Sequence, residues 1–244
     1  MPKSTSARVF IALIVISGFC TFGDAILNAN PIHAIRFASF LLVACFAARL
    51  RLKLPGLTGS MSVNLPFILV AVAEMSVLEA LIVGCFSTVV QCLPGKQQKL
   101  NKIQAAFNFS NMALAVSATR LVYLSGVISV EVASAPLRLC LAAAVFFLVN
   151  SIPVATVMAL TEAGNAWHIW AGIFQLSFPY FVASAGIATT VLTLTFRIGW
   201  QIPIAVLPLM LGIYHSYRQL LGITARSLFA ISATGKAAAM EAKA

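Results

Sequence analysis

Charged residues are scarce in this chain of 244 residues. Six are acidic and 16 are basic, so charged residues make up 9% of the sequence, against about a quarter in soluble domains. The mean hydropathy is +0.98, and several apolar runs approach or exceed the roughly 17–25 residues that cross a bilayer as a helix. These features exclude an ordinary soluble domain and predict an integral membrane protein surrounded by lipid.

Catalytic and metal-binding patterns are missing as well. The sequence contains no P-loop, HExxH or GxSxG motif, and its three histidines, His33, His168 and His215, are scattered. The five cysteines all fall in apolar runs and form no CxxC pair, so we expect them to pack as small apolar residues. We therefore predict neither an enzyme nor a metal or cofactor.

A net charge of +10 would suit a protein that binds nucleic acid, but the basic residues are not gathered in one patch. They lie in the short connections between apolar runs, where residues that orient a membrane protein are found. We expect no nucleic-acid partner.

The apolar runs predict an all-α, polytopic membrane helix bundle of about eight transmembrane helices. The spans are approximately 8–26, 33–50, 57–73, 75–93, 103–124, 137–160, 177–196 and 201–218. Residues 1–218 form the predicted transmembrane domain, and residues 219–244 form a short cytoplasmic tail that is either helical or disordered. Between spans six and seven, the stretch NAWHIWAGIFQ (165–175) carries two tryptophans and predicts a separate interfacial helix.

Lysine and arginine placement predicts the orientation. With the N-terminus in the cytoplasm, twelve basic residues fall on the cytoplasmic side and four on the other. The four are Arg36, Arg120, Arg138 and Arg197. This positive-inside bias predicts that both termini lie in the cytoplasm.

The third span begins with an unusual polar stretch, GLTGSMSVNLP (56–66). Thr58, Ser60, Ser62 and Asn64 alternate with other residues, and only nine apolar residues follow. Nine helical residues rise about 14 Å, too little for a hydrocarbon core of about 30 Å, so the polar stretch must lie at membrane depth. Either it forms a full helix with hydroxyls bonded to the preceding turn, or the span is broken and lines a cavity.

A second polar feature occurs in the fifth span. Asn101, Gln104, Asn108 and Asn111 are spaced by three, four and three residues, which places them on one helical face. Buried amides need hydrogen-bond partners, and Ser62 with Asn64 are the expected candidates. The sequence leaves open whether these groups clamp two helices together or line a ligand pocket.

Charged side chains near the outer ends of the spans complete the set of candidate binding residues. Glu74 and Glu79 flank the start of the fourth span, and Arg120 lies near the outer end of the fifth. A Glu–Arg pair could close the outer mouth of the bundle, and Asp24 could pair with Arg36 across the first outer loop. Each of these side chains is also close enough to an interface to reach water.

Three stretches carry a family resemblance: LRLKLPGLTGSMSVNLPFILVAVAEMSVLEALIVGCFSTVVQCL, FNFSNMALAV and VLPLMLGIYHSYRQLL. They resemble the N-terminal multi-helix membrane region of bacterial signalling proteins that carry HD-GYP or GGDEF modules. The resemblance implies an inner-membrane sensor. The sequence ends at Ala244, where that family enters its catalytic module, so no cyclic-dinucleotide chemistry is carried over.

Three functions compete at this stage. The leading hypothesis is a sensory or small-ligand-binding module that acts through a cytoplasmic signalling partner. The second is a small-molecule transporter or its substrate-binding subunit, with a ligand that is part polar and part apolar. The third is a structural or assembly protein without a ligand.

Overall fold

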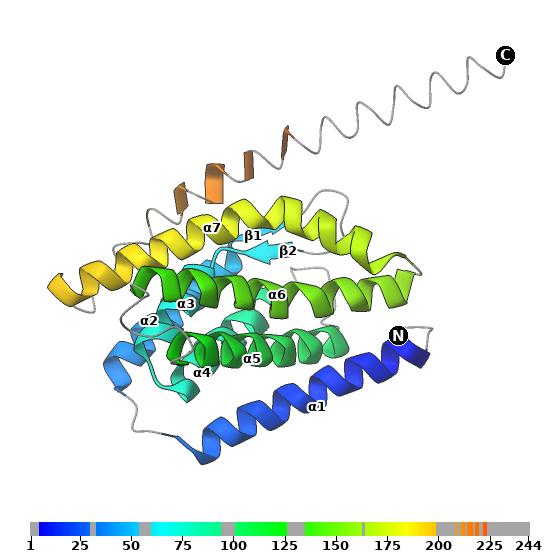
Figure 1. The fold of residues 1–244 in the computed structure, drawn as a ribbon, viewed down its shortest axis with the longest axis horizontal. Helices are drawn as coiled ribbons and strands as arrows, with labels where there is room; N and C mark the ends of the chain where they lie inside the picture. Colours follow the sequence, from blue (N-terminus) through cyan, green and yellow to red (C-terminus); the bar gives the residue numbers. More distant parts are fainter. Residues whose placement is uncertain are drawn as a thin grey trace.

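The computed structural model describes residues 5–29, 33–53, 60–93, 101–125, 135–162 and 164–198, together with a few positions between 208 and 223. The described chain is an all-α bundle with one short hairpin (Figure 1). Its elements are α1 (Thr5–Leu27), α2 (Ala34–Arg49), β1 (Arg51–Lys53), β2 (Ser60–Ser62), α3 (Leu65–Glu74), α4 (Val77–Cys92), α5 (Lys102–Leu124), α6 (Ala135–Glu162) and α7 (Ala166–Ile198).

Three described helices are long and apolar enough to cross a membrane: 5–27, 137–162 and 166–194. This finding supports an integral membrane protein. The helices α2 and α4 have 16 residues each and rise about 24 Å. Most of the predicted eighth span, 201–218, and of the predicted tail, 219–244, lies outside the described residues.

The third predicted span is broken. Residues Ser60–Ser62 form strand β2, which pairs antiparallel with β1 so that Arg51 is opposite Ser62, and helix α3 begins only at Leu65. Pro66 lies in the first turn of α3, where its missing N–H costs no hydrogen bond. The alternation of polar residues is thus partly that of a strand, and the alternative of one continuous helix is wrong.

Helix α3 forms the centre of the bundle. Eight of its ten residues are buried, which is typical of a core helix that is apolar on all sides. It packs against α4, α5 and α7. It is only about 15 Å long, and protein surrounds it from Leu65 to Val72.

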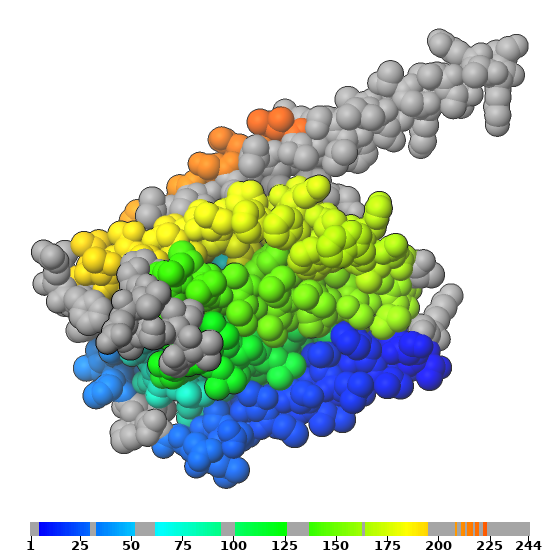
Figure 2. Space-filling model, viewed as in Figure 1, coloured from blue at the N-terminus to red at the C-terminus, as the bar shows by residue number. Residues whose placement is uncertain are grey.

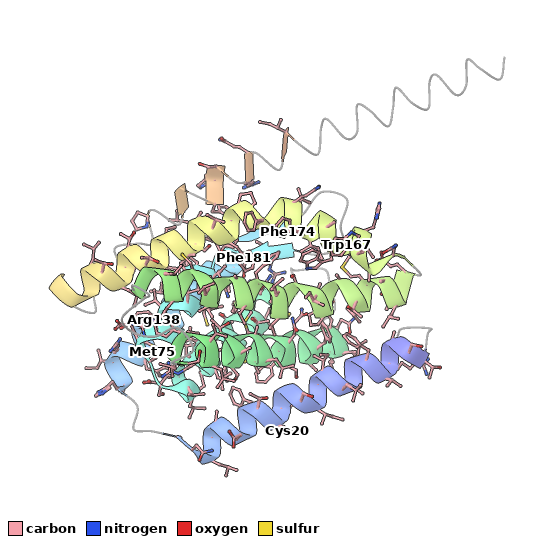
Figure 3. All side chains as sticks on the ribbon, in the orientation of Figure 1. Cys20, Met75, Arg138, Trp167, Phe174 and Phe181 are labelled. Carbon is pink, nitrogen blue, oxygen red and sulfur yellow. The ribbon has the colours of Figure 1, made fainter. Side chains whose placement is uncertain are left out.

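The interfacial helix predicted at 165–175 is not a separate element. These residues form the first part of α7, which runs unbroken from Ala166 to Ile198 despite Pro179. Aromatic rings contact one another along it in tilted pairs: Trp167 and Trp170 at 5.2 Å between ring centroids, and Trp170 and Phe174 at 5.5 Å. Figure 3 labels Trp167 and Phe174 on this helix. A helix of 33 residues is about 50 Å long, so its first turns can extend past the hydrocarbon core without a break.

Helix α1 lies along one edge of the bundle and packs on α5 (Figure 2). The contact is close at Gly18, where an added Cβ would lie 2.4 Å from the Cα of Ser110. Small residues at such crossings let two helix backbones approach each other in a membrane. The outward side of α1 is apolar and exposed, at Leu13 and Ile16 among others, as expected of a surface that faces lipid.

Candidate functional site: a polar pocket at the start of α3

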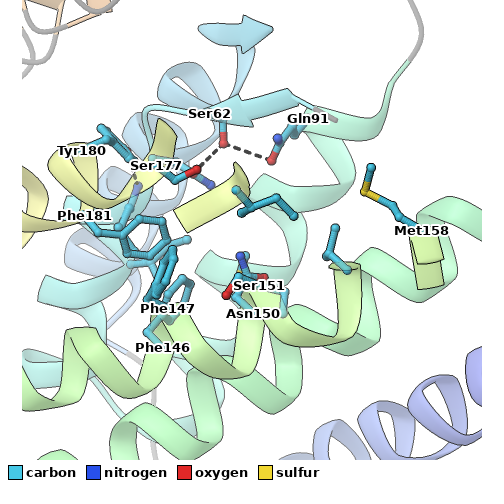
Figure 4. A pocket seen from close by; sticks show the side chains of 16 residues that line it. Ser62, Gln91, Phe146, Phe147, Asn150, Ser151, Met158, Ser177, Tyr180 and Phe181 are labelled. Atoms are coloured by element: carbon cyan, nitrogen blue, oxygen red, sulfur yellow. Dashed lines mark hydrogen bonds between the residues drawn. The ribbon is translucent and has the colours of Figure 1, made fainter. Parts of the chain in front are cut away.

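A cavity of about 160 Å³ lies where β2 ends and α3 begins. Residues of β2, α3, α4, α5, α6 and α7 line it, and it is partly open to the outside. Most of the lining is apolar, but six polar side chains reach it: Ser62, Asn64, Gln91, Asn150, Ser151 and Ser177. Figure 4 shows Ser62 and Gln91 on one wall, and Asn150 and Ser151 on the opposite wall.

On the β2–α3 wall, the polar side chains satisfy one another. Ser62 Oγ lies 2.6 Å from Asn64 Oδ1 and 3.0 Å from Gln91 Oε1. Asn64 Nδ2 donates to Ser87 Oγ on α4 at 2.8 Å. Asn64 occupies the N-cap position of α3 but makes no capping hydrogen bond, so its side chain ties the break in the chain to α4 instead.

On the α6 wall, Asn150 is hydrogen-bonded to Asn111, which lies outside the pocket. Asn111 Nδ2 on α5 donates to the backbone oxygen of Asn150 at 2.9 Å and to Asn150 Oδ1 at 3.1 Å. This contact uses the acceptor of the Asn150 amide and leaves its Nδ2 without a described partner. Asn150 therefore lines the pocket with an unused donor.

Two serines on this side add further unused groups. The Ser177 hydroxyl on α7 has no hydrogen-bond partner among the described residues, although only 4% of the residue is exposed. Ser151 accepts a hydrogen bond from Trp170 Nε1 at 3.0 Å, and its own proton has no described acceptor. Buried polar groups are normally paired, so unpaired groups on one wall of a cavity mark it as a place where a bound molecule would gain hydrogen bonds.

Aromatic side chains close one end of the pocket (Figure 4). The rings of Phe147 and Phe181 meet edge to face, 4.6 Å apart between centroids, and Phe146 lies 6.2 Å from Phe181. The Tyr180 hydroxyl accepts a hydrogen bond from the backbone nitrogen of Leu65 at 3.3 Å. It thereby satisfies one of the free N–H groups that every helix leaves at its N-terminus.

Of the predicted binding residues, only Ser62 and Asn64 line this pocket. Asn111 lies one contact behind it, through Asn150. Asn108 donates to Cys92 Sγ on α4 at 3.3 Å and is not part of the lining. The direct pairing of the fifth-span amides with Ser62 and Asn64 does not occur among the described contacts.

The predicted charged residues do not line the pocket, and their contacts lie at or beyond the C-terminal end of α3. Arg36 on α2 forms an ion pair with Glu74 Oε2 and also donates to the Glu74 backbone oxygen at 3.2 Å. Arg120 Nη1 donates to the Val72 backbone oxygen. Two arginines thus stabilise the C-terminal carbonyls of α3, where the helix dipole is negative.

The remaining predicted pairings differ from the structure. Glu79 forms a capping box with Ser76, in which Oε2 accepts from the Ser76 backbone N–H at 2.9 Å; its interaction with Arg120 is electrostatic, without a described hydrogen bond. Asp24 accepts a hydrogen bond from Asn28 at 3.1 Å. The predicted Asp24–Arg36 pair is wrong, because Arg36 binds Glu74.

Sequence reasoning missed most of the pocket wall on α6 and α7. The adjacent pair Asn150–Ser151, two polar residues in an apolar run just before Pro153, was the available signal. Ser177 and Gln91 carry no such signal, because single polar residues are common in membrane helices and usually bond to their own helix.

Comparison with known protein families, with curated protein sequences and with solved structures gives no match. The similarity to the membrane region of HD-GYP and GGDEF proteins stays an expectation from the sequence.

Proposed function

We propose that this protein binds a small molecule in the pocket at the start of α3, as a sensory module of the bacterial inner membrane that acts through a cytoplasmic partner. The observation that carries the binding proposal is the unused hydrogen-bonding capacity of Asn150 and Ser177 on a cavity wall. A wall that only held helices together would pair these groups with each other.

The orientation belongs to this proposal. With both termini in the cytoplasm, the ends of α6 and of β2 that border the pocket lie in the cytoplasmic half of the bundle, and the Arg36–Glu74 pair lies in the outer half. A ligand would then enter from the cytoplasm or the inner leaflet, close to where a signalling partner would act.

A carrier function is the second candidate, and the broken third span favours it. Transporters hold substrates where a helix is interrupted inside the membrane and irregular backbone lines a cavity. Here, β2 supplies extended backbone at the pocket, and α3 begins beside it.

The experiment for binding uses the full chain in lipid nanodiscs and a library of small molecules, followed by ligand-observed NMR. We expect saturable binding of at least one molecule, lost in Val154→Phe, which fills the cavity from α6. The matched control is Ile152→Phe, at an exposed position of the same helix outside this pocket. If no molecule binds, or if both variants bind as the parent does, the proposal fails.

The readouts for sensor and carrier differ. A carrier moves the bound molecule into sealed proteoliposomes. A sensor binds it without flux, and a pull-down with the sensor recovers a cytoplasmic protein only when the ligand is present. Flux that is lost in Val154→Phe and kept in Ile152→Phe would replace the sensory proposal by the carrier.

A further inference from the structure

We infer that the pocket accepts a neutral, single-ring heteroaromatic molecule with a carboxamide or lactam edge. This inference rests on the proposed binding function and specifies the class of ligand. Size, charge, polar groups and ring contacts each contribute to it.

The cavity volume sets the size of the ligand. At about 160 Å³, the pocket is close to an apolar protein cavity of about 150 Å³ that takes up one benzene molecule. A single six-membered ring fits this space, and its substituent can extend toward the opening.

The lining sets the charge. None of the 16 described residues that line the pocket is charged. An ion moved from water into such surroundings would lose its hydration without gaining a counter-charge, which is costly. The ligand is therefore neutral.

The unpaired groups on α6 and α7 set the polar edge. Asn150 Nδ2 offers a donor, and the Ser177 hydroxyl can donate or accept. A carboxamide or a lactam presents one carbonyl acceptor next to one N–H donor, which matches a donor from Asn150 and an acceptor or donor from Ser177. A molecule without a hydrogen-bonding group would leave both protein groups unpaired.

The aromatic side chains at one end of the pocket indicate that the ligand contains a flat ring. Phe146, Phe147 and Phe181 form a cluster with tilted and edge-to-face contacts, and Figure 4 shows them beside the space between the two polar walls. A flat ring adds a further aromatic contact to such a cluster, and each aromatic pair contributes about 0.5–1.5 kcal/mol beyond the area that it buries. An aliphatic ligand of equal size would lack this contact.

The test compares three molecules with the same ring and different substituents. Nicotinamide is neutral with a carboxamide, nicotinate carries a carboxylate, and 3-methylpyridine has neither; uracil adds a lactam. We expect nicotinamide or uracil to bind the full chain in nanodiscs at concentrations up to about 10 mM, and nicotinate and 3-methylpyridine to bind about tenfold more weakly or not at all.

Two serines of α7 provide matched variants. We expect Ser177→Ala to weaken nicotinamide or uracil binding about fivefold. Ser184→Ala should leave it unchanged, because Ser184 is equally buried on the same helix and does not line the pocket.

Several outcomes would overturn the inference. Nicotinate binding as well as nicotinamide would refute a neutral ligand, and equal binding of 3-methylpyridine would refute the polar edge. If none of the probes binds but another library molecule does so in a manner sensitive to Val154→Phe, the ligand class is wrong and the binding function stands. If the library gives no such molecule either, both fail.

Discussion

Asn111 on α5 donates one amide nitrogen to two oxygens of Asn150 on α6, its backbone oxygen at 2.9 Å and its Oδ1 at 3.1 Å. The contact joins the two helices and fixes the orientation of the Asn150 amide. Asn150 can present Nδ2 to the pocket because Asn111 occupies its oxygen. Asn111 is thus a positioning residue for a site that it does not line.

Replacing Asn111 by leucine removes this restraint. We expect the unfolding free energy to fall by about 1 kcal/mol, as for hydrogen bonds between membrane helices, and the affinity for a pocket ligand to fall about tenfold. Thermal unfolding and ligand-observed NMR measure the two effects. Asn108→Leu is the control, since among the described residues the Asn108 side chain bonds to Cys92 and lies outside the pocket. Equal loss of affinity in both variants would contradict the role of Asn111.

The ion pair between Arg36 and Glu74 should stabilise the outer end of α3. Arg36 also donates to the last backbone oxygen of that helix, so we expect Arg36→Met to lower the unfolding free energy by about 1–2 kcal/mol. Glu74→Gln should cost less, because the backbone contact is kept. A double-mutant cycle measures the coupling, and a coupling near zero would show that the pair contributes nothing.

The crossing of α1 and α5 depends on a missing side chain. At Gly18, an added Cβ would meet the backbone of Ser110 at 2.4 Å, so Gly18→Ala should destabilise the bundle by about 1–3 kcal/mol. Gly23 lies on the same helix, and an added Cβ there meets no atom within 4 Å. Gly23→Ala should therefore leave the melting temperature unchanged or raise it slightly. Identical melting of the two variants would refute the close α1–α5 contact.

The orientation of the chain can be tested with alkaline phosphatase fusions, which are active only outside the cytoplasm. Lys96 and Lys99 lie between α4 and α5, whereas the segment 126–134 contains no basic residue. We expect an inactive fusion in 94–100 and an active one in 126–134. The reverse pattern of activity would overturn the cytoplasmic placement of both termini.

The sequence singled out the polar start of the third span but left open whether the span is broken, and it did not give the partners of the polar groups. Span length was enough to predict that the stretch 56–66 lies at membrane depth, because nine helical residues cannot cross a bilayer. The contacts depend on how helices pack. Asn108 and Asn111 are about 60° apart around the helix axis. Because α5 packs on both α4 and α6, Asn108 contacts Cys92 on α4 and Asn111 contacts Asn150 on α6.

The predicted interfacial helix failed for a similar reason. Tryptophan is enriched at the membrane–water interface, so Trp167 and Trp170 indicate a position at the interface. They do not indicate where a helix begins or ends. Residues 171–178 contain no proline, so every residue keeps its backbone N–H donor. Gly172 is the one glycine among them, and a single glycine is tolerated within a helix. Helix α7 therefore continues through this stretch. The apolar run 177–196 therefore gave the existence of this helix and misplaced its start.

The short helix α3 has a consequence for how the protein is made. A segment of ten residues preceded by a strand cannot enter lipid alone, because the edge of β2 that does not pair with β1 would face hydrocarbon. We expect α3 to reach its position in the bundle only after α4, α6 and α7 have been inserted into the membrane. The centre of the folded molecule would then be the last part to reach its position during biosynthesis.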